Sequence, residues 1–177
     1  NFTAKADNDL TFSAAGSLTT AGGTIVLRAD NDDDRNGTGG ALTMADGLSV
    51  NAGSGTITLA ADEHITAAQL LTTNDTDQAV TITSTSGGLV DAGDSGGADI
   101  VARDAAAVVT LSTATGIGAT GNALETDATT LVASVSGTGN VSIDANTAIT
   151  LRHVIRTRNS QQLCEPTHMC DSLFPHA

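Results

Sequence analysis

Aliphatic and hydroxyl residues alternate along this chain in a short pattern that recurs many times. The clearest copy is Gly-Thr-Ile-Val-Leu-Arg-Ala-Asp at 23–30, which returns as Gly-Thr-Ile-Thr-Leu-Ala-Ala-Asp at 55–62. Looser copies occupy 79–84, 107–112 and 139–144. An alternation of period two predicts β-strands with one buried face. We expect the central aliphatic residues to point inward and stack as ladders: Val26, Ile57, Ile82, Leu111 and Ile143.

The spacing of these copies indicates a repeat architecture. They return every 23 to 32 residues, and shorter alternating segments such as 10–12, 17–20 and 48–50 lie between them. Two or three short strands per repeat are typical of a parallel β-helix, in which each coil stacks on its neighbour. We therefore expect an all-β domain over residues 1–151, a β-solenoid of about five or six coils. Segment 64–73 is expected as strand, with a single helical turn as the alternative, and 87–97 is expected to be rich in turns.

The composition fits such thin, regular layers. The chain has no Trp or Tyr, only three Phe, 19 Gly and 2 Pro, so the core must consist of Ala, Val, Leu and Ile. The net charge of −13 disfavours contact with nucleic acids and anionic membranes, and it favours solubility and weak cation binding. No apolar run of 18 residues is present, so we expect no membrane insertion. Because the chain begins with Asn1 rather than Met, it could be a processed product or a fragment.

The character of the sequence changes at Arg152. Segment 152–177 contains both Pro, both Cys and three of the four His, and the alternation of Gly and Thr stops there. Two interpretations remain open for this tail: a frameshifted or cloning-derived segment, and a cap over the last coil of the solenoid. Its residue types also allow a zinc site or a disulfide, which would involve Cys164, His168, Cys170 and His176.

The segment 109–131, which contains a strand, Gly116-Ile117-Gly118 and Leu124-Glu125-Thr126-Asp127-Ala128, resembles repeats of giant bacterial exoproteins of the filamentous-haemagglutinin-like type. The continuation at 136–143 follows the same pattern, and the resemblance covers roughly residues 10–151. It implies a right-handed parallel β-helix that is secreted or displayed on the bacterial cell surface and acts as a stalk or adhesive surface. It implies no catalytic residue.

An acidic loop follows the first strong strand. Asp32, Asp34, Asn36 and Gly37 match the first half of a calcium-binding loop, in which alternate side chains converge on one hard cation. The twelfth position of that loop is Thr43 rather than Glu, so the usual closing ligand is missing, and Asp30 or Asp46 would have to replace it. The sequence thus offers two interpretations, a calcium site that stiffens the coil and a solvated acidic loop.

The segment Gly93-Asp94-Ser95-Gly96-Gly97 matches the nucleophile turn G-x-S-x-G of α/β-hydrolases. If Ser95 is a nucleophile, His64 would be its base, and Asp75, or else Asp62 or Asp77, would orient that base. His153 is a second candidate base. The strand, turn and helix that surround such a serine in hydrolases are not predicted here, and the alternative interpretation is a plain solenoid turn.

Together with this resemblance, the sequence leads us to expect a structural and adhesive segment of a bacterial surface or secreted exoprotein, which binds a host or cell-surface ligand of unknown identity. A small serine esterase or peptidase is the alternative. Because a β-helix interrupted between repeats exposes an unpaired strand edge, we also expect homo-oligomers through the open ends.

Overall fold

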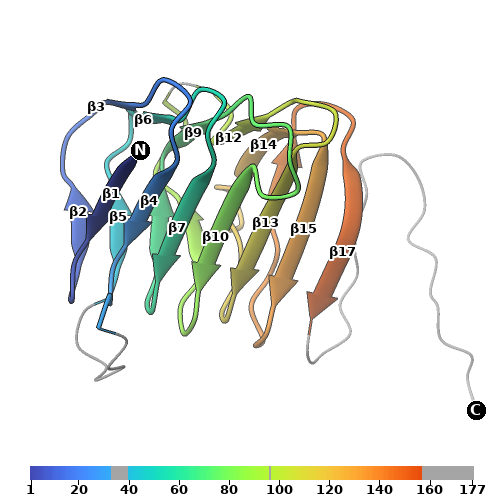
Figure 1. The fold of residues 1–177 in the computed structure, drawn as a ribbon. Helices are drawn as coiled ribbons and strands as arrows, with labels where there is room; N and C mark the ends of the chain where they lie inside the picture. Colours follow the sequence, from blue (N-terminus) through green and yellow to red (C-terminus); the bar gives the residue numbers. More distant parts are fainter. Residues whose placement is uncertain (33–39, 96, 157–177) are drawn as a thin grey trace, which may run out of the picture.

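The computed structural model describes residues 1–32, 40–95 and 97–156, the last four of these without their side chains. Within these ranges the secondary-structure elements are all strands, joined by turns and loops, and every pair of neighbouring strands is parallel. Sheet A has the order β1 (Phe2–Lys5), β4 (Ile25–Arg28), β7 (Ile57–Ala61), β10 (Val80–Ser84), β13 (Val108–Thr113), β15 (Thr130–Val135) and β17 (Thr150–Arg156). These strands stand side by side in Figure 1, coloured in sequence order from blue to orange-red.

Two further sheets complete the fold. Sheet B has the order β11 (Leu89–Asp91), β8 (Ile65–Ala67), β5 (Leu42–Met44) and β2 (Leu10–Phe12). Sheet C has the order β16 (Ile143–Ala145), β14 (Leu124–Ala128), β12 (Ile100–Ala102), β9 (Gln69–Leu71), β6 (Leu48–Asn51) and β3 (Gly16–Thr19). From β1 to β12 the chain visits sheets A, B and C in turn, so hydrogen-bonded partners come from successive passes, such as Ile25 with Ile57. The expected all-β class with parallel, stacked strands is confirmed, and the arrangement is compatible with a β-solenoid.

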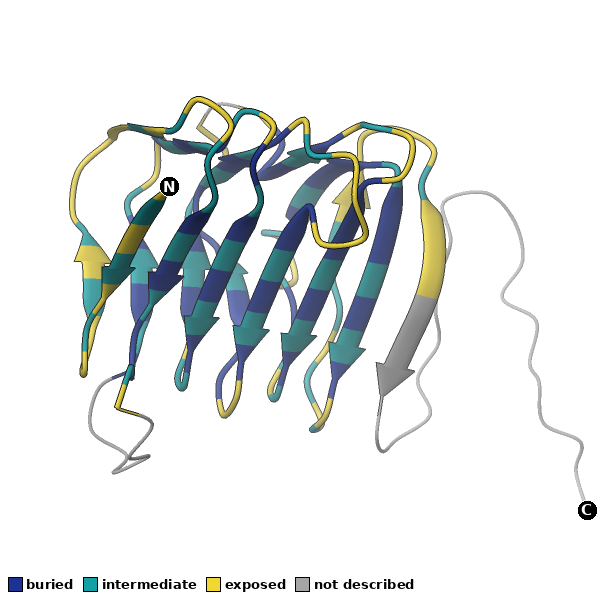
Figure 2. Ribbon diagram, in the orientation of Figure 1, coloured by how far each residue is buried: buried dark blue, intermediate teal, exposed yellow. Residues whose placement is uncertain are grey.

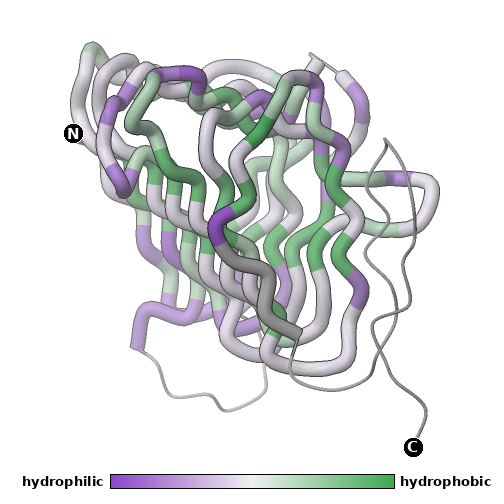
Figure 3. Tube along the Cα trace, turned by 90° about the vertical axis from the view of Figure 1, so that its right-hand side faces the viewer, coloured by the Kyte–Doolittle hydropathy of each residue, from purple (hydrophilic) through white to green (hydrophobic). Residues whose placement is uncertain are grey.

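The core lies between the three sheets. Buried and half-buried residues alternate along the strands of sheet A, which Figure 2 shows as bands across β4, β7, β10, β13 and β15. The view in Figure 3, turned by 90°, shows successive passes of the chain behind one another. Aliphatic residues at paired positions stack into ladders. One ladder is Ile25, Ile57, Val80, Val109 and Leu131, and the next is Leu27, Leu59, Ile82, Leu111 and Ala133.

The expected inward position is confirmed for Ile57, Ile82 and Leu111 and wrong for Val26, whereas Ile143 packs against the core from a different sheet. Ile57, Ile82 and Leu111 are fully buried. Val26 is only half-buried, because its neighbours Ile25 and Leu27 take the inward positions of β4. In an Ile-Val-Leu run the period-two pattern fits either face, and pairing decides between them.

Ile143 packs against the core as expected, but it does so from another sheet rather than in the ladders of sheet A. Ile143 begins β16, which pairs with β14 in sheet C, and it is half-buried. In sheet A the strand after β13 is β15, so 139–144 is not a further copy of the anchor strand. Segment 139–144 resembles the anchor strand only loosely, through its Gly, Val and Ser residues, and this similarity did not indicate the correct sheet.

Several strand predictions can be compared directly. Segment 64–73 forms β8 and β9, so the strand prediction is confirmed and the helical turn is wrong. Segment 87–97 is not made only of turns, because 89–91 forms β11, which pairs with β8. The predicted boundary at Arg152 falls inside β17, whose backbone pairs with β15 as far as Arg156. Residues 157–177, including the four Cys and His positions considered for zinc or a disulfide, lie outside the described residues.

In the part of the chain that the structure describes, no helix is long and apolar enough to span a membrane.

Candidate functional site

The turn after β11 carries Ser95, the predicted nucleophile. Ser95 is exposed, and its hydroxyl Oγ donates a hydrogen bond of 2.8 Å to Oδ2 of Asp46. The Ser95 backbone N–H also donates to Oδ1 of the same carboxylate, at 3.2 Å. Asp46 follows β5, so this double contact ties two segments of sheet B together across 49 residues of sequence. The contacts assign Ser95 a structural role at the turn.

The predicted base, His64, lies at the other end of sheet B. It directly precedes β8, and its Nδ1 accepts a hydrogen bond of 3.0 Å from the backbone N–H of Gly88, which precedes β11. Ser95 and Asp46 instead follow the carboxyl ends of their strands. Since all strands of the sheet are parallel, the intervening strand separates His64 from Ser95 by roughly 10 Å. The structure does not bring the two side chains together.

Asp75, the residue expected to orient the base, lies in a third place. It is exposed in the connection between β9 and β10, and its Oδ1 accepts a hydrogen bond of 2.5 Å from the backbone N–H of Ala106. The side chain of His153, the second candidate base, lies outside the described side chains. Hydrolysis through Ser95 requires a base within hydrogen-bond reach, and the positions of Ser95, His64 and Asp75 do not supply one.

The predicted calcium loop is described only at its start. Asp32 is exposed at the end of a turn, whereas Asp34 and Asn36 lie outside the described residues. The calcium prediction for this loop stays a prediction.

A cluster of acidic side chains, not anticipated from the sequence, lies between the turn at 93–95 and sheet C. Asp91, Asp94 and Glu125 each offer a carboxylate oxygen, and these oxygens lie within 4.8 Å of one another. Asp99 adjoins them, because its Oδ2 accepts a hydrogen bond of 2.9 Å from the Glu125 backbone N–H. We call Asp91, Asp94, Asp99 and Glu125 the acidic cluster. Among the described residues, Asp91, Asp94 and Glu125 are the one group of His, Cys, Asp and Glu close enough to share a metal ion.

The electrostatics of the acidic cluster are unusual because much of it is buried. Asp99 and Asp91 are only 2% and 6% exposed. Burial, assisted by the neighbouring charge of Asp91, raises the pKa of Asp99 to about 8, although the hydrogen bond from the Glu125 N–H lowers it. The sequence by itself contains little indication of this cluster. Asp99 and Glu125 each directly precede an inward residue of sheet C, and only strand pairing places them side by side.

Another buried carboxylate of sheet C, that of Asp127, is paired with a cationic side chain, unlike those of the acidic cluster. Nε of Arg103 donates a hydrogen bond of 2.6 Å to Asp127 Oδ2, and the two side chains form an ion pair. This hydrogen bond and a further one from Thr147 hold the pKa of the Asp127 carboxyl below its usual value, although burial opposes them. Asp127 thus has a cationic partner within the described chain.

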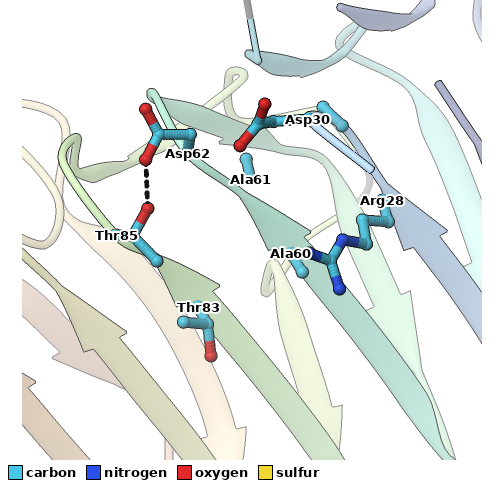
Figure 4. Close-up of a pocket in the computed structure, with 8 residues that line it drawn as sticks. Arg28, Asp30, Ala60, Ala61, Asp62, Thr83 and Thr85 are labelled. Atoms are coloured by element: carbon cyan, nitrogen blue, oxygen red, sulfur yellow. Dashed lines mark hydrogen bonds between the residues drawn. The ribbon is translucent and has the colours of Figure 1, made fainter. Parts of the chain in front are cut away.

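An open groove lies at the carboxyl ends of β4, β7 and β10. Its volume is about 320 Å³. Figure 4 shows Asp30 and Asp62 at one end and Arg28 beside Ala60, with the Thr85 hydroxyl donating to Asp62. The groove brings charges of both signs to the margin of sheet A, without the enclosed apolar walls typical of small-molecule sites. It is lined by Arg28, Ala29, Asp30, Ala60, Ala61, Asp62, Thr83 and Thr85.

The outer face of sheet A bears side chains in register, most of them small from β7 onward. Strand pairing aligns two outward rows, in which half-buried hydroxyl residues predominate from β7 onward. Parallel strands repeat at roughly 4.8 Å, so these hydroxyls form a regular array. The rows are Thr3, Val26, Thr58, Thr81, Thr110 and Val132, and Lys5, Arg28, Ala60, Thr83, Ser112 and Ser134.

Comparisons of the chain with protein families, with curated proteins and with solved structures found no match.

Proposed function

We propose that this chain is a segment of a right-handed parallel β-helix with about five or six coils, which serves a structural and adhesive role in a bacterial cell-surface or secreted exoprotein. The order of the three sheets supports the β-helix, because each strand of sheet A pairs with strands one pass before and after it. A stack of this kind extends by adding passes, and it presents a long continuous surface.

The outer face of sheet A carries the adhesive part of the proposal. Its rows of Thr and Ser hydroxyls can donate and accept hydrogen bonds at regular intervals. The strands beneath are locked by ladder hydrogen bonds and by a fully buried aliphatic core, so the face loses little conformational freedom on contact. Pre-organised polar surfaces of this kind suit repeated weak contacts with a host or cell-surface ligand, where many small contributions add up.

The ends of the stack support assembly. Strands β1 and β17 are the edge strands of sheet A within the described residues, and the N–H and C=O groups of such edges can pair with another copy of the chain. We therefore include homo-oligomers through the open ends in the proposal.

An adhesion assay tests this function. Beads coated with the purified protein should retain epithelial cells under flow better than albumin-coated beads. The double variant Thr81→Lys/Thr110→Lys places long charged side chains in the middle of the outer face of sheet A, and it should lower retention to the albumin level. The control Ser17→Lys/Ser49→Lys makes the same change in charge at paired, outward positions of sheet C, and it should leave retention unchanged.

Two outcomes would contradict the proposal. One is retention by the wild-type protein that does not exceed albumin. The other is turnover of p-nitrophenyl esters that vanishes in Ser95→Ala, which would favour the hydrolase alternative instead.

A further inference from the structure

Two buried carboxylate oxygens of the acidic cluster accept no hydrogen bond from an N–H or hydroxyl group of the described chain. Asp91 is 6% exposed, and its Oδ1 accepts a hydrogen bond of 2.7 Å from the backbone N–H of Gly93. Its other oxygen, Oδ2, is buried and has no hydrogen-bond partner, and the same is true of Oε2 of Glu125. Leaving a buried charged acceptor unpaired is strongly unfavourable. The protonated carboxyl of Asp99 lies beside Asp91 and Glu125 and can donate to only one of these two oxygens, so the other indicates that a ligand belongs here.

The local charge points to a cation. No Lys, Arg or His forms an ion pair with Asp91, Asp94, Asp99 or Glu125 within the described residues, in contrast to Asp127 with its Arg103. Carboxylates crowded within 4.8 Å repel one another unless a proton or a positive ion lies between them. We propose that Asp91, Asp94 and Glu125 bind a divalent cation of the calcium class.

The donor set selects the type of ion. The three nearby ligand atoms are all carboxylate oxygens, and the cluster has no His or Cys, which favours a hard cation over zinc or copper. Oxygens bound to one Ca²⁺ lie about 2.3–2.6 Å from it, so two of them are at most about 5 Å apart, which matches the observed spacing. Mg²⁺ requires a tighter octahedron at about 2.1 Å and retains its water more firmly. Water and further oxygens would complete the coordination of Ca²⁺.

The position of the site gives the ion a mechanical role. Asp91 ends β11 in sheet B, Asp94 lies in the following turn, and Glu125 lies in β14 of sheet C, one pass further along the chain. A shared cation would therefore fasten this turn to the next pass of the chain. It would act beside the Ser95–Asp46 contacts, which hold the same turn from the other side. This role is independent of the adhesive function proposed above, so either can fail alone.

Calorimetric titration of chelator-treated protein with CaCl₂ tests the site. The wild-type protein should show saturable binding, and the melting temperature should rise with calcium, because a ligand of the folded state stabilises it. Asp94→Asn, at an exposed position, and Glu125→Gln should each weaken this binding at least about tenfold, as expected for loss of a charged ligand. MgCl₂ should bind more weakly than CaCl₂.

Two matched controls separate this site from others. Asp77→Asn removes one exposed charge elsewhere and should bind calcium as the wild type does. Asp32→Asn/Asp34→Asn removes the predicted ligands of the acidic loop, and it should leave the binding assigned to the acidic cluster intact. The proposal is wrong if the wild-type protein shows no saturable binding, or if the Asp32/Asp34 variant loses all of it. It is also wrong if Asp94→Asn and Glu125→Gln, with wild-type circular dichroism, retain wild-type affinity.

Discussion

The register of β4 can be tested by truncating two neighbouring side chains that face opposite ways. Leu27 is fully buried, and Ala4 and Leu59 flank it along its ladder. Val26, next to it in the chain, points to the outer face and is half-buried. We compare Leu27→Ala with Val26→Ala.

The expected magnitudes follow from burial. Leu27→Ala removes three buried carbons, worth about 2.4 kcal/mol at ~0.8 kcal/mol each, and the cavity raises the total to roughly 2–5 kcal/mol. Val26→Ala removes two methyl groups that already contact water, and the loss should stay below about 1 kcal/mol. Because both residues lie in the same strand, fraying from the N-terminal end affects the two variants alike.

Urea unfolding at neutral pH measures the difference. The chain has no Trp or Tyr, so far-ultraviolet circular dichroism rather than intrinsic tryptophan fluorescence must report unfolding. The shift in midpoint, multiplied by the slope of the unfolding free energy against urea, gives the loss of stability. If Val26→Ala destabilises the protein as much as Leu27→Ala, the strand register described above is wrong, and the inward position that the sequence suggested for Val26 is right.

Two further predictions concern Asp99 and Gly55. Burial raises the pKa of Asp99 to about 8, so the folded state keeps a proton that the unfolded state releases near pH 4. The free energy of unfolding should therefore fall as the pH rises from about 4 to about 8. In EDTA, Asp99→Asn should therefore gain stability over wild type between pH 5 and 8, by up to about 4 kcal/mol at ~1.4 kcal/mol per pH unit, and parallel pH profiles would contradict this. Gly55→Ala should destabilise the protein by roughly 2 kcal/mol or more, since its Cβ would collide with the carbonyl oxygen of Gly23 in the adjacent pass. At Gly121 a Cβ would meet no atom within 4 Å, and only the backbone φ of +83° disfavours alanine. If thermal melts show a larger loss of stability for Gly121→Ala than for Gly55→Ala, the close contact between Gly55 and the Gly23 carbonyl is wrong.

The sequence by itself determined the class of the fold. Near-copies such as 23–30 and 55–62 place equivalent residues at equivalent positions, and identical short strands stack most readily in parallel and in register. Alternation of aliphatic and hydroxyl residues then separated an inner from an outer face, which is why Ile57, Ile82 and Leu111 were predicted correctly.

Tertiary structure alone decided the register where the pattern was ambiguous. An Ile-Val-Leu run can bury either its middle residue or its two ends, and the pairing of Val26 with Thr58 puts Val26 outside. It also decided which polar residues meet, because side chains distant in sequence become neighbours only through strand pairing. Asp91 and Glu125 are brought together by two sheets and a turn, whereas His64 and Ser95, about one pass apart, are held at opposite ends of one sheet. Local composition does not predict such long-range contacts, because they depend on where each strand begins and ends in the stack.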